Sequence, residues 1–125
     1  MKVNLITFGF NKGDLEDVFY IIDTRGIKNP HSDPWLRDLT GYDGEVREQV
    51  IRHPKAKPIL AYCLSLVANS PNNEITLGIG CTGGNHRSVS IALELMDRLE
   101  DLGHTVNIVH RDMRRKEQND YSTCS

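Results

Sequence analysis

The chain has 125 residues, a formal net charge of −2 and 38% hydrophobic residues, and 26% of its residues are charged. This length fits one domain, whose apolar fraction suffices for a core without disulfides or a structural metal. Dispersed charges of both signs argue against a protein that coats nucleic acid over its whole surface. We therefore predict one domain over residues 1–125, with a polar tail that frays from residue 113 onward.

Cysteine usage and the lack of a targeting segment indicate the compartment. Cys63, Cys81 and Cys124 are odd in number and lack the paired spacing of zinc sites. The apolar run at the N-terminus is soon interrupted by Gly9 and Gly13, and no stretch is long enough to span a bilayer. We expect a cytoplasmic protein with reduced thiols and with no metal, cofactor or membrane partner.

The first half of the chain predicts two strands and a long loop. Residues 3–8 and 18–22 are continuous apolar runs typical of buried parallel strands, and the segment between them has room for a turn or one helical turn. Residues 24–44 are rich in glycine and proline and predict a long ordered loop with a short helix near residues 35–38. We expect Trp35 to anchor this loop in the core. A loop of this length in a compact domain is more often functional than not.

The second half alternates helices with strands. Apolar residues at three- and four-residue steps predict helices over residues 45–52 and 56–68, followed by a buried strand over residues 75–79. A further helix runs from Ser88 to a left-handed cap at Gly103, and residues 106–109 form a fourth strand. This order predicts an α/β fold, a three-layer sandwich whose mainly parallel central sheet has about four strands.

The turn between the third strand and the third helix is the most informative segment. Residues 78–88 include four glycines, and a glycine-rich turn of this kind directs backbone N–H groups toward one point. The start of the following helix adds the positive end of its dipole. Arg87 has a planar guanidinium that suits two phosphate oxygens. We therefore predict a phosphate-binding loop over residues 81–87.

Polar residues are expected to gather around this loop. Ligands of open α/β sheets bind beyond the carboxyl ends of the strands. That rule brings together residues 7–9, Asp23 with Arg25, the loop 81–87, and residues 110–112. The binding site should lie along this edge of the sheet.

The same loop permits an enzymatic alternative. Cys81 and Arg87 have the Cys-x5-Arg spacing of cysteine-dependent phosphatases, in which a thiolate attacks phosphorus while the arginine holds the phosphate oxygens. Gly80 stands where those enzymes usually have a histidine. Such a reaction also needs a general acid, for which the sequence offers Asp23, Asp43 and Asp112 and does not choose among them.

Short motifs spread over nearly the whole chain carry a family resemblance. In chain order they are Thr7-Phe8-Gly9-Phe10, Asp23-x-Arg25, Asn29-Pro30-His31, Asp33-Pro34, Leu36-Arg37, Leu39-Thr40-Gly41, Gly78-Ile79-Gly80-Cys81-Thr82-Gly83-Gly84, His86-Arg87-Ser88-Val89 and His110-Arg111. Together they resemble the C-terminal domain of the RapZ family of RNase adapter proteins and its YvcJ-type relatives. The resemblance implies binding of a phosphorylated amino sugar, glucosamine-6-phosphate, in a regulatory role. In the enterobacterial adapter it also implies binding of a small regulatory RNA.

The resemblance also implies which residues contact the ligand. These are His31, Cys81, Thr82, Gly83, His86 and Arg87, with Asp23, Arg25 and Asn29 along the same edge, and the predicted loop adds Gly84, Asn85 and Ser88. Full-length members carry a Gly-x4-Gly-Lys-Ser/Thr nucleotide-binding domain, a motif that these 125 residues lack. We therefore expect a stand-alone domain that senses a metabolite without binding ATP or GTP. A homodimer is plausible because the family forms oligomers.

A basic cluster near the C-terminus raises RNA as a second partner. It consists of Arg111, Arg114, Arg115 and Lys116. Such clusters at a chain end are usually solvated, but they can also contact RNA phosphates. The chain has no aromatic strand motif for single-stranded RNA, so RNA binding is predicted mainly by analogy with the family.

Overall fold

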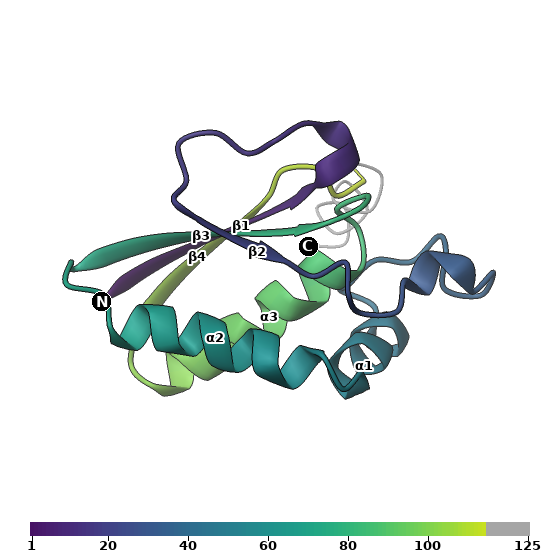
Figure 1. Ribbon diagram of the computed structural model, residues 1–125. Coiled ribbons are helices and arrows are strands. Elements are labelled where there is room, and N and C mark those ends of the chain that lie inside the picture. The colour runs from purple at the N-terminus through teal and green to yellow at the C-terminus, as the bar shows by residue number, and fades with distance from the viewer. Residues whose placement is uncertain (115–125) are drawn as a thin grey trace, which may run out of the picture.

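The computed structural model describes residues 1–114, which form a parallel sheet of four strands, three α-helices and two 3-10 helices (Figure 1). The strand order is β2-β3-β1-β4, and each neighbouring pair is parallel. The predicted α/β fold is thereby confirmed. No helix in this part of the chain combines the length and the apolar character needed to cross a membrane. The elements are β1 (Lys2–Gly9), η1 (Phe10–Lys12), β2 (Tyr20–Asp23), η2 (Pro30–Ser32), α1 (Gly44–Arg52), α2 (Ala56–Ala68), β3 (Glu74–Cys81), α3 (Arg87–Asp101) and β4 (Thr105–His110).

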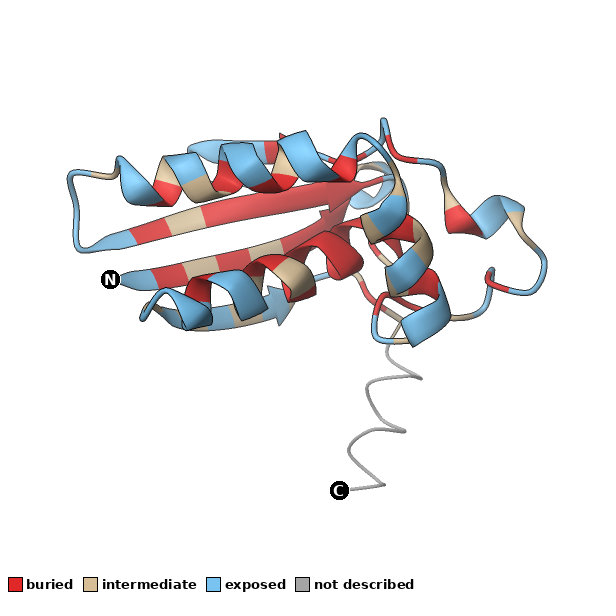
Figure 2. Ribbon diagram, turned by 90° about the horizontal axis from the view of Figure 1, so that it is seen from below, coloured by how far each residue is buried: buried red, intermediate tan, exposed pale blue. Residues whose placement is uncertain are grey.

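The layers follow from the order of the strands. The three α-helices lie on one face of the sheet (Figures 1 and 2), whereas the connection from β1 to β2 passes over the opposite face (Figure 1). Crossovers between parallel strands are right-handed, and the steps from β2 to β3 and from β3 to β4 run in the same direction across the sheet. Their helices therefore share one face. The step from β1 back to β2 runs the other way, so residues 10–19 form the third layer.

The core lies between the sheet and the helices. Alternate residues of β1 and β3 face the helices, as the period of two in a strand requires. They are buried together with the inward faces of α2 and α3 (Figure 2). Removal of this apolar surface from water is the main term that stabilises the fold. Prominent members are Val3, Leu5, Leu60, Ile75, Leu77, Ile79, Ile91, Leu95 and Leu99.

After β4 the chain turns back onto α3. Met113 is buried and packs with Val89 and Leu93 in a small second cluster. The tail was predicted to fray from residue 113, but residues 113 and 114 contact the domain. Residues 115–125 lie outside the described part of the chain.

Two sequence expectations about the first connections are wrong in detail. The buried strand predicted over residues 18–22 runs from Tyr20 to Asp23 and buries only Ile22. The chain before it turns at Asp17, which has a φ of 62°, and Phe19 is 99% exposed. The core role expected of Trp35 is also wrong, because this side chain is 88% exposed. Leu36, which is buried, anchors the long loop instead. The short helix of this loop is η2, and residues 34–38 form turns.

Candidate functional site

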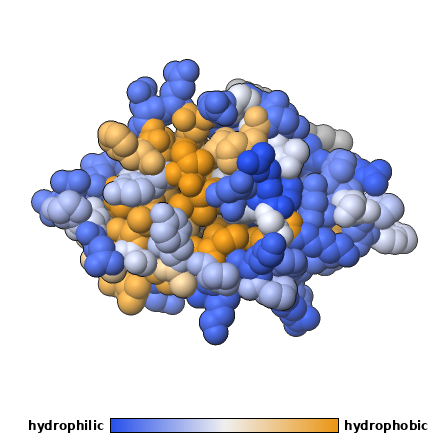
Figure 3. Space-filling view, in the orientation of Figure 1, coloured by the Kyte–Doolittle hydropathy of each residue, from blue (hydrophilic) through white to orange (hydrophobic). Residues whose placement is uncertain are grey.

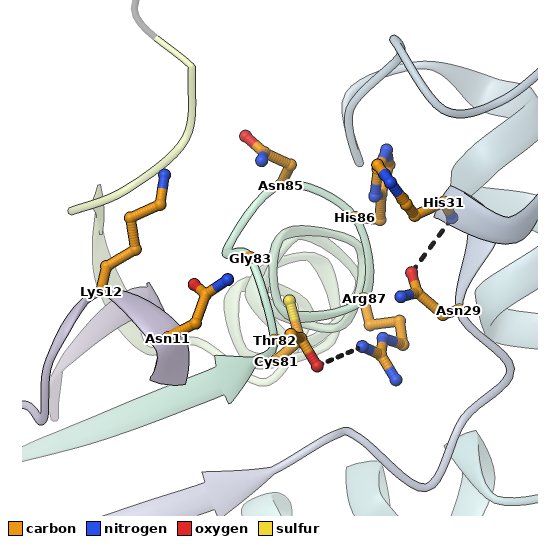
Figure 4. A pocket seen from close by; sticks show the side chains of 10 residues that line it. All are labelled: Asn11, Lys12, Asn29, His31, Cys81, Thr82, Gly83, Asn85, His86 and Arg87. Carbon is orange, nitrogen blue, oxygen red and sulfur yellow. Dashed lines mark hydrogen bonds between the residues drawn. The ribbon is translucent and has the colours of Figure 1, made fainter.

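A cavity of about 260 Å³ lies beyond the carboxyl ends of β1 and β3, beside the start of α3 (Figure 4). Its lining contains two cationic side chains and two histidines, and it contains no aspartate or glutamate. A cavity with this charge suits an anionic ligand the size of a small metabolite. The lining residues are Asn11, Lys12, Asn29, His31, Cys81, Thr82, Gly83, Asn85, His86 and Arg87.

The floor of the cavity is a loop that packs directly on the end of β1. A Cβ atom on Gly9 would lie 2.6 Å from the carbonyl carbon of Gly83, and one on Gly84 would lie 2.8 Å from the Gly9 nitrogen. Gly84 also has a φ of 82°, which side chains rarely tolerate. The N–H of Asn11 donates to the Thr82 carbonyl (3.1 Å), so η1 is fixed to the same loop. The glycines are therefore required by close backbone contact.

The loop presents unpaired backbone donors. Within residues 1–114, the N–H groups of Gly83, Asn85 and His86 have no hydrogen-bond acceptor, and no side chain caps the first turn of α3. A helix start with unpaired N–H groups attracts anions through these donors and through the helix dipole. The predicted phosphate-binding loop thus has its donors available.

Cys81 lies under this loop and is almost fully buried. Its Sγ accepts a hydrogen bond from the Gly84 N–H (3.3 Å) and donates one to Ser88 Oγ (3.2 Å). Ser88 is itself buried and does not line the cavity. Its hydroxyl therefore contacts the Cys81 thiol, and a ligand in the cavity would contact the loop above it instead.

Arg87 is buried, and protein acceptors hold most of its guanidinium. Nη1 donates to the carbonyls of Arg25 and Ile27, both at 3.0 Å, and Nη2 donates to Thr82 Oγ1, also at 3.0 Å (Figure 4). Its Nε is buried and has no partner among residues 1–114. The Arg87 guanidinium, which was predicted to hold two phosphate oxygens, is therefore already engaged in joining the chain after β2 to the loop.

Two histidines stand on the Arg87 side of the cavity, with ring centroids 6.3 Å apart. His86 is buried and its Nε2 lies 3.1 Å from the Arg37 carbonyl, which can only accept, so this nitrogen carries the proton. Burial, together with the charge of Arg114, lowers the pKa of His86 and favours the neutral ring. His31 is exposed, and its backbone N–H donates to Asn29 Oδ1 (3.1 Å). His31 and Asn29 thus join His86 and Arg87 as the polar side chains at this end of the cavity.

Asp23 and Arg25 pair with each other at the end of β2 and do not line the cavity. Arg25 Nη2 lies 2.8 Å from Asp23 Oδ2, and the guanidinium carbon of Arg25 lies 4.0 Å from the centre of the Phe10 ring. The hydrogen bond from Arg25 holds the pKa of Asp23 below its ordinary value. The pair fixes the rim of the site.

The carboxylates considered as a general acid are all engaged elsewhere, and none lines the cavity. Asp43 accepts the N–H of Thr40 (2.8 Å), and Asp112 accepts the N–H of Gly9 (2.8 Å) while it pairs with Arg111. Burial alone would raise the pKa of Asp112, but its hydrogen bonds from Arg111 and from the Gly9 N–H outweigh this effect and lower it. A general acid at neutral pH needs a raised pKa.

Known proteins are similar to nearly the whole of this chain. Residues 1–114 match the RapZ C-terminal domain. The chain belongs to the RapZ C-terminal domain family. Its relatives include proteins named nucleotide-binding protein from Rubrobacter xylanophilus, 43% identical over 124 residues, and from Thermobifida fusca, 40% identical over 123 residues. These alignments cover 90% and 93% of this chain but 41% and 42% of the relatives. The chain thus spans about two fifths of the length of the curated relatives it matches.

In this RapZ C-terminal domain, most of the residues predicted for the site lie together. The six that the resemblance implicated, His31, Cys81, Thr82, Gly83, His86 and Arg87, all line the cavity, as do Asn29 and Asn85. Asn85 also accepts the backbone N–H of Arg114 (2.9 Å). No group of three histidine, cysteine or acidic side chains within residues 1–114 is placed to hold a metal ion.

Asn11 and Lys12, which were not predicted from the sequence, line the opposite wall of the cavity (Figure 4). Both follow directly after the motif that ends at Phe10, at the carboxyl end of β1. The edge rule applied to the first strand stopped at Gly9. Extension of that rule by one helical turn would have included them.

The two described residues of the basic cluster in this RapZ C-terminal domain donate hydrogen bonds to backbone carbonyls of the domain itself. Arg111 donates to the carbonyls of Gly13 (2.7 Å) and Asp14 (3.0 Å). Arg114 donates to the carbonyls of Arg37 (3.2 Å) and Leu39. Arg115 and Lys116 lie outside the described residues. RNA binding therefore stays a prediction.

Proposed function

We propose that this chain binds a phosphorylated metabolite, an amino-sugar phosphate such as glucosamine-6-phosphate, in the cavity above residues 81–87, and that binding has a regulatory role. The observation that carries the proposal is the set of unpaired N–H groups on Gly83, Asn85 and His86 at the start of α3. A phosphate group is the common metabolite group that accepts several such bonds at once.

The lining suggests how the rest of the ligand is held. Asn29 and His31 offer amide and imidazole groups for sugar hydroxyls or the amine on one side of the loop. Arg87 Nε has no partner within residues 1–114 but is buried, so the held guanidinium contributes mainly its positive charge to the site. Within residues 1–114, only neutral and cationic groups line the cavity, and this favours the dianionic form of the phosphate over its protonated form.

A sugar phosphate fits this cavity better than a nucleotide. The relatives are named nucleotide-binding proteins, and a nucleotide also carries phosphate. The lining includes no phenylalanine, tyrosine or tryptophan on which a base would stack, and about 260 Å³ is small for a base and a ribose together. We infer that the nucleotide site of the longer relatives belongs to the part of their length that this chain does not match.

Calorimetric titration of the purified protein tests the proposal. Glucosamine-6-phosphate should bind more tightly than glucose-6-phosphate, and both should bind more tightly than inorganic phosphate, because the sugar adds contacts to Asn29 and His31. AMP serves as the nucleotide control and should bind weakly. The proposal fails if none of the phosphates binds, and its sugar assignment fails if AMP binds best.

A cysteine phosphatase is the second candidate, and the contacts of the Cys81 sulfur favour it. The Gly84 N–H donates to the sulfur and the thiol donates to Ser88 Oγ, so two polar groups hold the sulfur in place beneath the loop, as a nucleophile requires. The carboxylates and the Arg87 fork argue against turnover, because the former lie outside the cavity and the latter is held by carbonyls. Slow hydrolysis of an aryl phosphate that disappears in Cys81→Ser, with ligand binding retained, would favour the enzyme. A sensor shows no hydrolysis in either protein.

A further inference from the structure

Two cationic side chains line the cavity, and they differ in how many protein groups already hold them. Arg87 is buried and donates to two backbone carbonyls and a hydroxyl. Lys12 lies on the opposite wall, is exposed, and makes no hydrogen bond or ion pair within residues 1–114. The loop over residues 82–86 lies between them (Figure 4). Of the two cations, Lys12 is the one that an entering anion can recruit.

The backbone that carries Lys12 is held firmly in place. The neighbouring N–H of Asn11 donates to the Thr82 carbonyl, and Arg111 donates to the carbonyls of Gly13 (2.7 Å) and Asp14 (3.0 Å). Phe10 packs edge-on against Phe8, with ring centroids 4.8 Å apart. Because both sides of η1 are fixed to the loop and to the end of β4, only the lysine side chain has to order when a ligand binds.

The carboxylate of Asp112 lies near Lys12 but does not neutralise the lysine's charge. Asp112 is close enough for the charge of Lys12 to act on it, but its carboxylate pairs with Arg111 at 2.7 Å and accepts the Gly9 N–H. Asp112 also does not line the cavity. The positive charge of Lys12 is therefore available to the ligand.

We propose that Lys12 contacts the phosphate of the ligand and so sets its orientation, with the phosphate at the Lys12 and Gly83 end of the cavity and the sugar at the Asn29 and His31 end. This rests on the proposed function, because it requires that a sugar phosphate occupies the cavity. The physical reason is charge matching. A flexible ammonium group can follow a phosphate oxygen, whereas the guanidinium of Arg87 would have to leave its carbonyl acceptors to do so.

The test compares Lys12→Met with Lys57→Met, which removes the same charge from an exposed position on α2 away from the cavity. Affinities for inorganic phosphate and for glucosamine-6-phosphate are measured by calorimetry in the wild type and in both variants. Lys12→Met should weaken both ligands by a similar factor of about ten to a hundred, as expected for loss of one charge-assisted contact to phosphate. Lys57→Met should leave both affinities unchanged.

A third variant, His31→Ala, tests the orientation. It should weaken the sugar phosphate and leave inorganic phosphate unchanged, since His31 is placed at the sugar end. If Lys12→Met binds both ligands as the wild type does, or if it weakens the sugar phosphate alone, the proposal about Lys12 is wrong while the proposed function stands. If the wild type binds neither ligand, the proposed function itself fails.

Discussion

The helix-covered face of the sheet and the edge at its carboxyl ends hold together in different ways. The covered face buries apolar side chains such as Leu5, Leu77 and Leu95, whose contacts are many and individually small. At the edge, glycine backbones touch directly, and arginines donate to carbonyls across the site. In such a core, a substitution lowers the free energy of unfolding in proportion to the side-chain volume that it removes. The edge depends on a few positions that permit no substitution, and these positions surround the cavity.

The largest expected effect is at Gly9. Gly9→Ala places a Cβ atom 2.6 Å from backbone of the loop, whereas Gly83→Ala, in the same contact region, meets its nearest neighbour at 3.6 Å. We expect Gly9→Ala to lower the free energy of unfolding by about 4 kcal/mol and Gly83→Ala by less than about 1 kcal/mol. Denaturant unfolding measures both. Equal stability of the two variants would contradict the close packing of the loop on β1.

A cavity in the core should have a smaller and purely structural effect. Leu95→Ala removes a fully buried side chain from α3 and should lower the free energy of unfolding by about 3 kcal/mol. Leu102→Ala, at an exposed position just after the same helix, is the control and should change it little. The folded fraction of Leu95→Ala should bind phosphate ligands as the wild type does. Loss of binding in a folded Leu95→Ala protein would show that core and edge are not independent.

Arg87→Ala should affect both stability and binding. The change leaves the carbonyls of Arg25 and Ile27 without their donor and should lower the free energy of unfolding by about 2 kcal/mol. It also removes a cation from the cavity, so phosphate affinity should fall. Arg98→Ala on the same helix removes a half-exposed arginine and should change neither quantity much. Thermal unfolding measures the stability and calorimetry the phosphate affinity. Unchanged stability of Arg87→Ala would contradict the claim that Arg87 holds the chain after β2 to the loop.

The smallest expected effect is a pH dependence that originates at His110. This ring lies between Thr7 Oγ1 (2.7 Å) and the Tyr42 hydroxyl (2.8 Å), and burial lowers its pKa from 6.5 to about 4. The unfolded chain therefore binds more protons between these values, and stability is lost as the pH falls from 6.5 toward 4. Since the ring is partly exposed, we expect a loss of about 1–2 kcal/mol. The loss should be smaller in His110→Asn, and an identical pH profile in that variant would assign it to other groups.

The architecture could be predicted from the sequence because the patterns that mark helices, strands and turns are local. Apolar steps of three and four residues located α1, α2 and α3, and glycines marked the turn before α3. The cap at Gly103 has the expected positive φ of 93°. The boundaries of β2 were less accurate, because continuous apolar character does not show that Phe19 points into solvent.

The roles of individual site residues depended on where distant segments come together. Arg87 was correctly placed beside the loop, but the direction of its guanidinium follows from the carbonyls of residues 25 and 27, which no local pattern locates. Trp35 was expected in the core on residue type alone, and its exposure follows from the turn held by Asp33. Lys12 reaches the cavity only because η1 folds onto the loop.

The most direct test of the account is a titration of the protein with glucosamine-6-phosphate, followed by two-dimensional amide NMR. We predict that the largest shifts occur at the N–H groups of Gly83, Asn85 and His86, because these donors have no acceptor within residues 1–114. The helix-covered core should hardly respond. Shifts confined to another surface, or the absence of shifts at saturating ligand, would contradict the claim that this loop is the phosphate site.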